Sequence, residues 1–434
     1  MNTAPALPAS PAAFRRVVLA SMLGTAIEWY DFFLYGTAAA LVFNRIFFPT
    51  LDPQAGTLAA FASYAVGFFA RPLGGIIFGH YGDRVGRKAM LVTSLVMMGV
   101  ATFLVGLLPT YDQIGFGAPL LLVLLRLVQG VAVGGEWGGA VLMVAEHADK
   151  KRRGFFVSWV QVGVPVGLIM ATGSYQLCGL LPEPAFLAWG WRVPFLFGIV
   201  LTGLGFFIRR SVLESPVFER APHGAGPTRL PLLEVLQDHR RSVLLAMGAR
   251  LAENAFFYIF TVWILSFATQ RLGMQKSTLL NGVLLGSAVQ LIAIPYFGAL
   301  SDRRGRKPVY IGGTCFLLAF TFPFFWLVET GDPFCAIAAI VIGLVGHAAL
   351  YGPQAAFFSE LFATRTRYTG ASLGYQLASP LAGGLAPLIA TGLLGWSGGA
   401  TWPIAIYLSG MAAITLVSVW LAAETNLLDL SDQG

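Results

Sequence analysis

Several charged side chains lie inside long apolar stretches of the chain, and these are the residues best placed to do chemistry. They are Glu28, Asp31, Arg126, Glu136, Arg250 and Glu253. Charged groups are rarely kept in apolar surroundings unless they pair with one another or face a polar cavity. The types and spacings of these residues therefore indicate what the protein binds.

Two of the arginines suit the recognition of a carboxylate. The guanidinium groups of Arg126 and Arg250 stay charged and can bind a carboxylate through two parallel hydrogen bonds. Glu253 follows Arg250 by three residues, which places both on one helix face. The pair belongs either to a binding site for a small organic acid or to an internal ion pair that stabilises the helix.

The acidic residues suit proton transfer. Glu28 and Asp31 are three residues apart, and two carboxylates that close in apolar surroundings are not expected to ionise together. One of them then carries a proton, and Glu136 is a third candidate for proton coupling. The alternative is a structural network of Glu28 and Asp31 with Arg126 or Arg71. Arg71 stands shortly before a loop in the sequence, so we expect it to belong to the gate at that loop and not to bind a ligand.

Uncharged polar residues complete the candidate binding set. They are Gln161, Tyr258, His347, Tyr351 and Gln376, with Gln129, Asn254 and Gln290 as further polar residues in apolar stretches. His347 and Tyr351 are four residues apart and share a helix face. A single buried histidine, however, more often satisfies neighbouring groups than binds a ligand.

Composition then sets the surroundings of these residues. Of 434 residues, 56% are hydrophobic and 11% are charged, with a mean hydropathy of +0.71. Ordinary soluble domains carry about 25% charged residues. The sequence therefore predicts an all-α polytopic membrane protein, in which a charge at the bilayer centre costs about 2.5–3.5 kcal/mol.

No enzyme or cofactor site is indicated. The three cysteines lack CxxC spacing, and the five histidines are scattered, so we expect no metal and no cofactor. The sequence contains neither a nucleophile–base pair nor a nucleotide-binding loop of the Walker type. We therefore expect a protein that is not an enzyme.

Twelve apolar runs are long enough to cross a bilayer, which needs about 20 residues. In the first half they lie at 17–43, 58–80, 89–109, 118–146, 155–181 and 191–209, and in the second at 242–269, 279–300, 309–329, 333–357, 369–395 and 400–423. A polar stretch rich in Pro and Gly separates the two sets. The sequence thus predicts two pseudo-symmetric six-helix bundles, 1–209 and 242–434, joined by a cytoplasmic linker at 210–241.

The basic residues predict the orientation of these helices. With the N-terminus on the cytoplasmic side, 21 of the 28 Lys and Arg residues fall in tails and loops on that side. Four fall on the opposite side (Arg45, Arg192, Arg271 and Lys276) and three within helices (Arg71, Arg126 and Arg250). This bias predicts that both termini are cytoplasmic. It also explains the net charge of +7 without a nucleic-acid partner.

One loop occurs twice and relates the two halves. Phe-Gly-x-x-x-Asp-Arg-x-Gly-Arg-Lys stands at 78–88 and again at 297–307, and seven of the eleven positions are identical. Each copy joins the second and third helices of its half. A weaker repeat places an arginine seven residues after Glu146 and after Glu360. Parallel halves of this kind are a known transporter architecture, with the substrate site between them near the middle of the membrane.

The repeated loops are expected to form a gate on the cytoplasmic side that holds the outward-facing state closed. The predicted gate residues are Gly79, Asp83, Arg84, Gly86 and Arg87 in the first copy and Asp302, Arg303, Gly305 and Arg306 in the second. The aspartates can pair with arginine or face the N-terminus of another helix, and glycines allow tight turns. The alternative for Arg and Lys is that they only anchor the loops at the membrane surface.

The repeated loop resembles the signature of the major facilitator superfamily. Other segments are similar to its metabolite:proton symporter branch, which holds carriers for shikimate, 2-oxoglutarate, citrate, and proline or betaine. They are Glu-Trp-Tyr-Asp-Phe-Phe-Leu-Tyr-Gly at 28–36, Arg-Pro-Leu-Gly-Gly at 71–75, the glycine-rich 129–139, Trp-Gly-Trp-Arg-Val-Pro-Phe at 189–195 and Glu-Ser-Pro-Val-Phe at 214–218. The resemblance covers nearly the whole chain, and it is not specific for substrate.

This resemblance implies a proton-coupled symporter of the bacterial inner membrane that imports a small organic acid by alternating access. Its partners would be the substrate, protons and the lipid bilayer, and we expect it to act as a monomer. Uptake of a zwitterionic osmolyte is the alternative, although the short tail after the last predicted helix argues against an osmosensing role. A solute sensor that does not transport is a further alternative.

Overall fold

The computed structural model describes residues 11–85, 87–134, 136–210, 235, 237, 239–362, 367–426 and 428. These ranges are almost entirely helical, and no strand occurs in them. Eleven of their helices are long and apolar enough to cross a membrane, and Val92–Leu107 is a shorter apolar helix. Together they correspond to the twelve predicted spans, which confirms the all-α polytopic fold.

The first half contributes six spans. They are α1 (Pro11–Leu41), α3 (Pro53–Val85), α4 (Arg87–Leu107), α6 (Gly117–Val133) with α7 (Trp137–His147), α8 (Arg153–Cys178) and α10 (Val193–Arg210). Short elements connect them: α2 (Phe43–Ile46), α5 (Tyr111–Ile114), η1 (Lys150–Arg152), α9 (Glu183–Ala188) and η2 (Gly190–Arg192).

The second half repeats this pattern. Its spans are α13 (Arg240–Tyr258) with η3 (Ile259–Trp263) and α14 (Ile264–Gln270), α15 (Lys276–Arg304), α16 (Arg306–Glu329), α17 (Pro333–Glu360), α18 (Arg367–Ser379) with η4 (Pro380–Gly384) and α19 (Leu385–Trp396), and α20 (Trp402–Leu421). The predicted linker, 210–241, lies mostly outside the described residues, so its boundaries stay a prediction.

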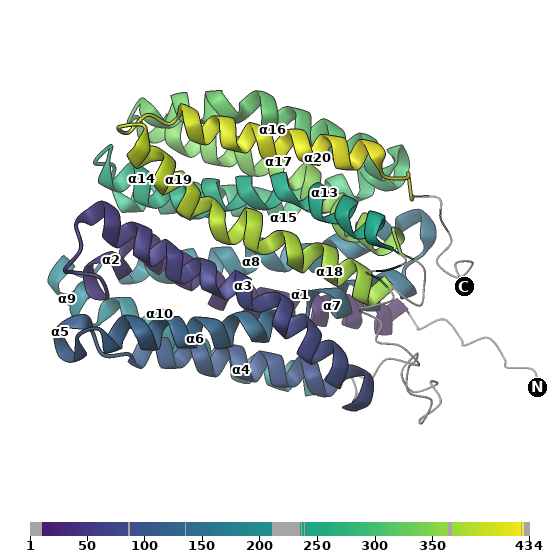
Figure 1. Cartoon of the computed structure of the whole chain (residues 1–434). Coiled ribbons are helices and arrows are strands. Elements are labelled where there is room, and N and C mark those ends of the chain that lie inside the picture. Colours follow the sequence, from purple (N-terminus) through teal and green to yellow (C-terminus); the bar gives the residue numbers. More distant parts are fainter. Residues whose placement is uncertain are drawn as a thin grey trace, which may run out of the picture.

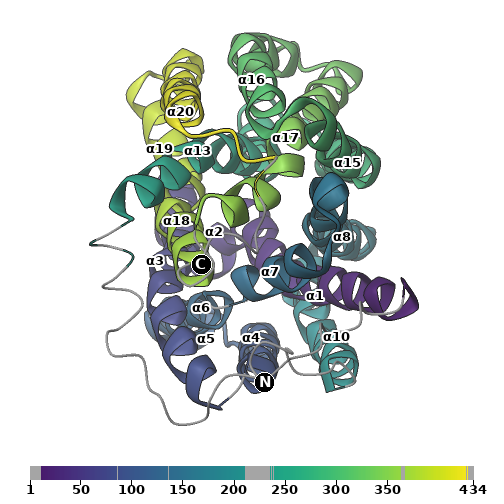
Figure 2. The ribbon, with the colours of Figure 1, turned by 90° about the vertical axis from the view of Figure 1, so that its right-hand side faces the viewer.

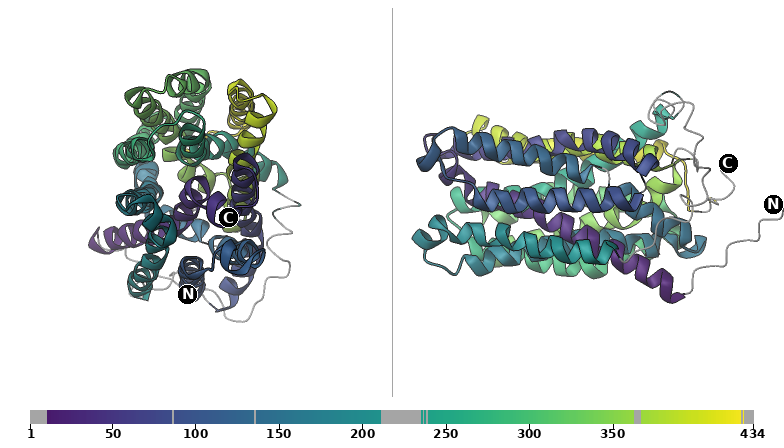
Figure 3. Two further views of the ribbon diagram at one scale, coloured as in Figure 1. Left: turned by 90° about the vertical axis from the view of Figure 1, so that its left-hand side faces the viewer. Right: turned by 90° about the horizontal axis from the view of Figure 1, so that it is seen from below.

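The two halves lie side by side, with their helix axes roughly parallel to one another (Figure 1). Helix α8 of the first half packs along α15 and α17 of the second, and α3 packs along α18, η4 and α19. The end-on view shows α8 beside α15 and α3 beside α18 (Figure 2). Helix α1 begins and α20 ends at the same end of the bundle, here named the gate end (Figure 3).

Polar contacts also join the two halves at the far end of the bundle, opposite the gate end. Gln270 donates to Thr57 at 3.1 Å, and Gln176 donates to Asn281 at 3.1 Å. In the first half, the exposed Arg45 pairs with Glu183 at 2.5 Å and lowers the pKa of that carboxyl group. The halves are thus in contact on the far side as well as at the gate end.

Two spans contain a π-helical turn where the halves meet. η3 follows Tyr258, and η4 contains Gly383 and Gly384. Any side chain at these two glycines would crowd Phe68 of α3. π-turns shift the register of a helix, and they often occur at functional sites. The two turns here bring α13 and α18 into close contact with the first half. The apolar periodicity of the sequence did not predict them.

Closely packed helices hold the first half together. Cβ atoms at Gly130 and Gly134 of α6 would overlap backbone atoms of α3, and those at Gly163 and Gly167 of α8 would crowd the backbone of α1. Small residues at four-residue spacing allow this approach between helices in membranes. The contact of Gly134 is with the carbonyl of Arg71, so this packing fixes the position of Arg71 next to α6.

Replacing Gly130 by alanine should destabilise the protein. The new Cβ would overlap the carbonyl oxygen of Gly67 and lie 2.7 Å from the Cβ of Ala70. Such overpacking typically costs about 1–3 kcal/mol, so we expect a clearly lower Tm for Gly130→Ala in detergent. Gly203→Ala in α10 is the control, because no atom lies within 4 Å of its added Cβ. Equal melting temperatures for the two variants would contradict this account of α3–α6 packing.

Candidate functional site

Arg250 lies in a buried polar cluster within the second half. Its Nη1 donates to Glu253 at 3.0 Å and to Gln354 at 3.0 Å, and its Nε faces the Ser379 hydroxyl at 3.4 Å. Gln354 also donates to Glu253 at 3.2 Å and to Tyr310 at 2.8 Å. Arg250 and Glu253 therefore form the internal ion pair that the sequence left as one of two possibilities, and their charges offset each other.

His347 extends this cluster. Its Nε2 lies 3.1 Å from the second oxygen of Glu253, and its Nδ1 lies 2.8 Å from the amide nitrogen of Gln290. That amide nitrogen also donates to the carbonyl of Leu344 at 3.0 Å. Because the Gln290 nitrogen is a donor, Nδ1 of His347 accepts and Nε2 carries the proton toward Glu253. The predicted neighbour Tyr351 packs its ring 5.1 Å from the imidazole.

Arg71 lies within a helix, as predicted, but its surroundings there were not predicted. Helix α3 continues to Val85, past the predicted end at 80, so Arg71 lies near the middle of the helix. It is 1% exposed, and all three of its side-chain nitrogens lack a hydrogen-bond partner among the described residues. Its guanidinium lies over the rings of Phe32 and Phe68, at 4.2 and 4.4 Å.

Arg126 lies near Arg71, but some of its side-chain nitrogens have hydrogen-bond partners. Its Nη1 donates to Gln129 at 3.1 Å and its Nε to the carbonyl of Tyr64 at 3.4 Å, while Nη2 has no partner in the described part of the chain. Its guanidinium also lies over Phe32, at 4.1 Å, and over Tyr35, at 4.4 Å. The faces of these rings attract cations, so aromatic contacts and not acidic partners hold both arginines.

A polar path runs from Arg126 toward Asp31. Gln129 donates to Thr102 at 2.9 Å, and the Thr102 side chain and the Asp31 carboxyl both face Gly198 of α10. Asp31 is 1% exposed, and its Oδ1 has no hydrogen-bond partner in the described ranges. The structure therefore places Asp31 inside the first half, among α1, α4 and α10, and not on the surface that meets the second half.

The other two candidate acids are also buried in the first half. Glu28 is 6% and Glu136 is 3% exposed, and Ser94 of α4 lies 3.5 Å from a Glu136 oxygen. Glu136 stands directly before α7, where the span formed by α6 and α7 is interrupted. All three candidate acids are therefore buried residues of the first half.

Aromatic side chains connect the two halves between these clusters. Tyr375 stacks on Trp137 with ring centroids 3.8 Å apart, and the Arg250 guanidinium lies 3.1 Å from the Tyr375 centroid. Trp137 donates to the predicted Gln161 at 3.0 Å, and the predicted Gln376 donates to the Gly134 carbonyl at 3.0 Å. The sequence analysis did not single out Tyr375 or Trp137 as site residues, since aromatic residues in apolar spans look like packing.

Tyr258 occupies the middle of this interface. Its ring lies 5.2 Å from that of Phe68 and 6.0 Å from that of Tyr64, both in α3. The Arg71 guanidinium lies 4.4 Å from the centroid of the same Phe68 ring that Tyr258 contacts. The predicted Tyr258 and the unexpected Arg71 are therefore brought together at the contact between the halves.

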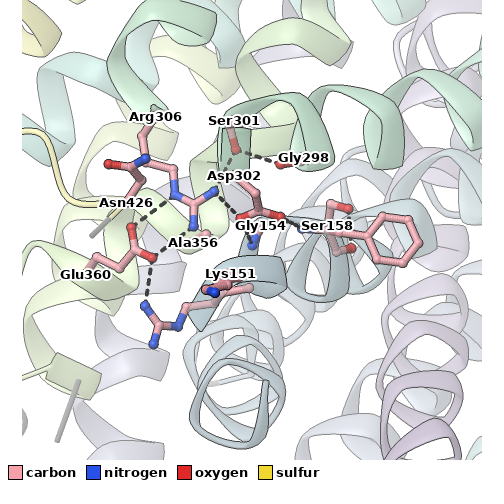
Figure 4. Close-up of polar contacts among 12 residues, drawn as sticks. Lys151, Gly154, Ser158, Gly298, Ser301, Asp302, Arg306, Ala356, Glu360 and Asn426 are labelled. Atoms are coloured by element: carbon pink, nitrogen blue, oxygen red, sulfur yellow. Dashed lines mark hydrogen bonds and ion pairs between the residues drawn. The ribbon is translucent and has the colours of Figure 1, made fainter. Parts of the chain in front are cut away.

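At the gate end, Asp302 of α15 crosses to the first half (Figure 4). Its carboxylate accepts hydrogen bonds from the backbone N–H groups of Gly154, at 2.7 Å, and Phe155, at 2.8 Å. These are unpaired donors in the first turn of α8, where a negative charge is favoured. Gly154 and Gly298 allow α8 and α15 to approach this closely. The predicted role of the aspartate in a contact between helices is supported here by geometry.

Arg306 and Glu360 form the centre of the same cluster. Arg306 binds both oxygens of Glu360, at 3.0 and 3.1 Å, and contacts Asp302 at 2.7 Å. Arg153 of the first half reaches Glu360 at 3.0 Å. Glu360 thus pairs with arginines outside its own sequence repeat, because the fold brings the first residues of α8 and α16 to the end of α17.

The segment after α20 adds contacts to the cluster of Asp302, Arg306, Glu360 and Arg153, here named the gate cluster. Glu424 accepts from the backbone N–H groups of Arg306, at 2.8 Å, and Lys307, at 3.0 Å. Thr425 donates to Glu360 at 2.7 Å, and Arg153 donates to the carbonyl of Leu428 at 3.3 Å. The sequence analysis missed these tail residues, because a short acidic tail carries no spacing that points to a partner.

The other predicted gate residues have different outcomes. Gly305 has a φ of +98° and forms the turn between α15 and α16, as predicted. Arg303 is exposed and takes no part in the bonds described here, which fits its alternative role as a surface anchor. In the first copy, Gly86 and the surroundings of Gly79, Asp83, Arg84 and Arg87 lie outside the described residues.

Comparison with known proteins identifies the family. A sequence profile described as Major Facilitator Superfamily matches residues 21–379. The chain belongs to the major facilitator superfamily. It is 44% identical over 416 residues to the shikimate transporter of Escherichia coli (strain K12), covering 95% of each chain. It is 42% identical to the inner membrane metabolite transport protein YhjE of the same strain, covering 95% of this chain and 94% of that one.

More distant relatives agree on the fold. The proline/betaine transporter of Escherichia coli (strain K12) is 33% identical, and the match covers 95% of this chain and 84% of that protein. The structure of the xylose transporter XylE from E. coli in a partially occluded inward open conformation superimposes with a TM-score of 0.74 at 18% identity. That match covers 96% of this chain and 100% of XylE. The protein is therefore a multi-span membrane transporter of the superfamily, and these relatives are transporters and not enzymes.

Removing Glu360 should strongly destabilise the protein. Glu360→Ala would leave the buried Arg153 without its counter-charge and Arg306 with Asp302 alone, and breaking a buried pair in this way typically costs about 3–5 kcal/mol. Arg303→Ala, one exposed arginine from the same loop, should change stability by no more than about 0.5 kcal/mol. Thermal unfolding of both variants in detergent measures the difference. Matching Tm values would show that Glu360 is not what holds the gate cluster together.

Proposed function

We propose that the protein is a proton-coupled symporter that imports a small organic anion, such as shikimate or another mono- or dicarboxylate, by alternating access. The observation that carries this proposal is Arg71, a buried cation in the middle of a span whose three side-chain nitrogens have no hydrogen-bond partner among the described residues. Its guanidinium lies over Phe68, the ring that Tyr258 of the other half contacts. A buried charge without a partner is costly. A carboxylate substrate would supply both the missing charge and the missing acceptors.

Arg126 and Arg250 are less suited to this task in the described state. Arg250 already has Glu253 as its counter-ion, and Arg126 already donates through two of its nitrogens. Arg126 lies over the same Phe32 ring as Arg71, so it adds positive potential to the site. We propose Arg71 as the main carboxylate ligand, with Arg126, Tyr258 and Gln376 as further residues near the substrate.

The remaining members of the predicted binding set would act on the substrate indirectly, through neighbouring side chains. Gln161 would hold Trp137, and His347, Tyr351 and Glu253 would position Arg250 and Tyr375 around the substrate. Because these residues already bond to one another, they would shape the site more than they would contact the ligand. This assignment follows from the hydrogen bonds that link Glu253 to His347 and Gln354.

Transport of a zwitterionic osmolyte is the second candidate, since a relative at 33% identity is a proline/betaine transporter. Quaternary ammonium groups are bound by open aromatic faces. Here Arg71 and Arg126 already lie over Phe32, Phe68, Tyr35 and Tyr64. A second cation near them would be repelled, so the site favours an anion. The higher identity to a shikimate transporter supports the same choice.

Asp31 is the proposed proton carrier. Its buried carboxyl has an unbonded oxygen, and Thr102 and Gln129 lie between it and Arg126. Protonation of Asp31 would change the charge near the arginines and so couple proton binding to anion binding. Glu28 and Glu136 are the other members of the proton-coupling set, and Glu28 lies one helical turn from Asp31 on α1.

The gate end is proposed to face the cytoplasm of a bacterial cell, with both termini on that side of the inner membrane. The bias of basic residues supports this orientation. The cluster of Asp302, Arg306, Glu360 and Arg153 would then be a cytoplasmic gate that must break when the halves rock apart. The protein is proposed to work as a monomer, because the halves of one chain supply both sides of the site.

Uptake by purified protein in proteoliposomes tests both the substrate class and the role of Arg71. The unmodified protein should accumulate an organic acid from a labelled panel, and a proton ionophore should abolish accumulation. Arg71→Gln should raise KM for that acid about 10- to 100-fold, the loss expected for hydrogen bonds to a charged group. It should also lose the preference for the acid over its carboxamide analogue.

Two results would overturn this prediction. Arg45→Gln, which removes an exposed arginine at the far end, is the matched control and should leave KM unchanged. If Arg71→Gln behaves like Arg45→Gln, Arg71 does not bind the carboxylate. If uptake persists undiminished with the ionophore, the symport proposal fails whatever Arg71 does.

Replacing Asp31 separates proton coupling from substrate binding. Asp31→Asn keeps the shape of the side chain but cannot release a proton, so accumulation driven by a pH gradient should be lost. Exchange of labelled for unlabelled substrate across the membrane needs no net proton movement and should persist. Asp112→Asn, in the exposed short helix α5, is the control. Undiminished proton-driven accumulation by Asp31→Asn would remove Asp31 from the coupling residues.

A further inference from the structure

The outer face of the second half contains a groove that transport of a small anion does not explain. It has a volume of about 390 Å³ and lies among α15, α16 and α17. Helices α15 and α16 each pack extensively along α17 but contact each other much less, which leaves a channel between them with α17 as its floor. The end-on view shows α17 between α15 and α16 (Figure 2).

The lining of the groove is apolar along most of its length. Phe297 and Leu300 come from α15, Phe316 from α16, and Val345 and Ala349 from α17. Gly312 opens the groove further, since no atom lies within 4 Å of the position where its Cβ would be. The volume is in the range of ligand sites, roughly 300–1,000 Å³.

The groove faces away from the proposed substrate site. Helix α16 packs on α15, α17 and α20, all in the second half, whereas the contacts between the halves run through α8 and α3. An apolar groove on the outside of a membrane-spanning bundle is exposed to lipid hydrocarbon. An acyl chain is therefore the material that fills it.

One end of the groove carries positive charge. Arg304, the last residue of α15, is the one charged side chain among the described residues that line it. It is exposed and forms no ion pair or hydrogen bond with any described residue, and the exposed Arg303 precedes it. With the gate end toward the cytoplasm, as proposed above, this charge lies at the leaflet whose anionic lipids attract basic residues.

We propose that this groove is a binding site for one anionic glycerophospholipid. An acyl chain lies along Phe297, Phe316 and Val345, and the headgroup phosphate pairs with Arg304. The charge at one end and the apolar channel leading from it match the two parts of such a lipid. A neutral lipid fits the channel but gains nothing from Arg304.

The site is adjacent to the gate cluster. Arg304 lies two residues from Asp302 and two from Arg306, and α17 ends at Glu360. A lipid in the groove contacts all three helices that carry these residues. Its removal is therefore expected to lower the Tm of the transporter as well as to free the groove.

Native mass spectrometry of the purified full chain tests the site with two probes, a phosphatidylglycerol and a phosphatidylcholine with the same acyl chains. We expect one phosphatidylglycerol to be retained in preference to phosphatidylcholine. Gly312→Phe fills the channel with a ring and should reduce retention of either lipid at least tenfold. Arg304→Gln should remove the preference for phosphatidylglycerol and leave phosphatidylcholine retention unchanged.

Gly410→Phe is the matched control. Gly410 is exposed on α20, also with no atom within 4 Å of its Cβ position, and it does not line the groove. Its variant should bind lipid like the unmodified protein. Equal retention of the two lipids, or equal retention by Gly312→Phe and Gly410→Phe, would overturn the proposal. Neither result bears on proton-coupled uptake, because no transport is measured.

A photoreactive phosphatidylglycerol, with its reactive group on the acyl chain, gives an answer on the unmodified protein in case Gly312→Phe fails to fold. Peptide mapping after illumination should find the label on α15, α16 and α17 near Phe297, Phe316 and Val345. Excess phosphatidylglycerol should compete with the label more strongly than phosphatidylcholine. Label spread evenly over the lipid-facing helices would contradict a defined site.

Discussion

The structure depends on how charges are kept inside an apolar bundle. An ion in such surroundings is tolerated only with a partner, and most of the buried charges described here have one. Arg250 has Glu253, and Glu360 has both Arg306 and Arg153. Arg71 differs, since aromatic rings lie against its guanidinium and none of its three side-chain nitrogens has a hydrogen-bond partner among the described residues. A buried arginine without an ion-pair or hydrogen-bond partner marks the place where a negatively charged ligand would lower the free energy of the protein.

Packing between helices keeps this charge in place. Glycines of α6 fit against the backbone of α3 at Arg71, and the π-turn at η4 brings glycines of the second half against Phe68. Close backbone contact leaves little freedom for either helix to slide. A small change in the relative position of the halves therefore changes what Arg71 and Tyr258 face, and alternating access requires a coupling of this kind.

The gate cluster shows the same principle at the end of the bundle. Asp302 binds the N-terminus of α8, and Arg153 binds Glu360 and the carbonyl of Leu428, so charged groups join the halves at this end. In the proposed gate, water would solvate these charged groups once the halves separate. A large apolar contact in their place would expose its surface to water on opening.

The sequence by itself determined the membrane class, the twelve spans and the repeat that relates the halves, because hydrophobic length, charge bias and repeated spacing are local properties of the chain. Only the tertiary structure decided which charges are paired. It gave Glu360 its partners from another helix and from the other half, assigned Arg250 to Glu253, and left Arg71 without a partner. Pairs such as Arg153 with Glu360, 207 residues apart, and Arg306 with Glu360, 54 apart, form only when the fold brings distant segments together, and no local pattern records such a meeting.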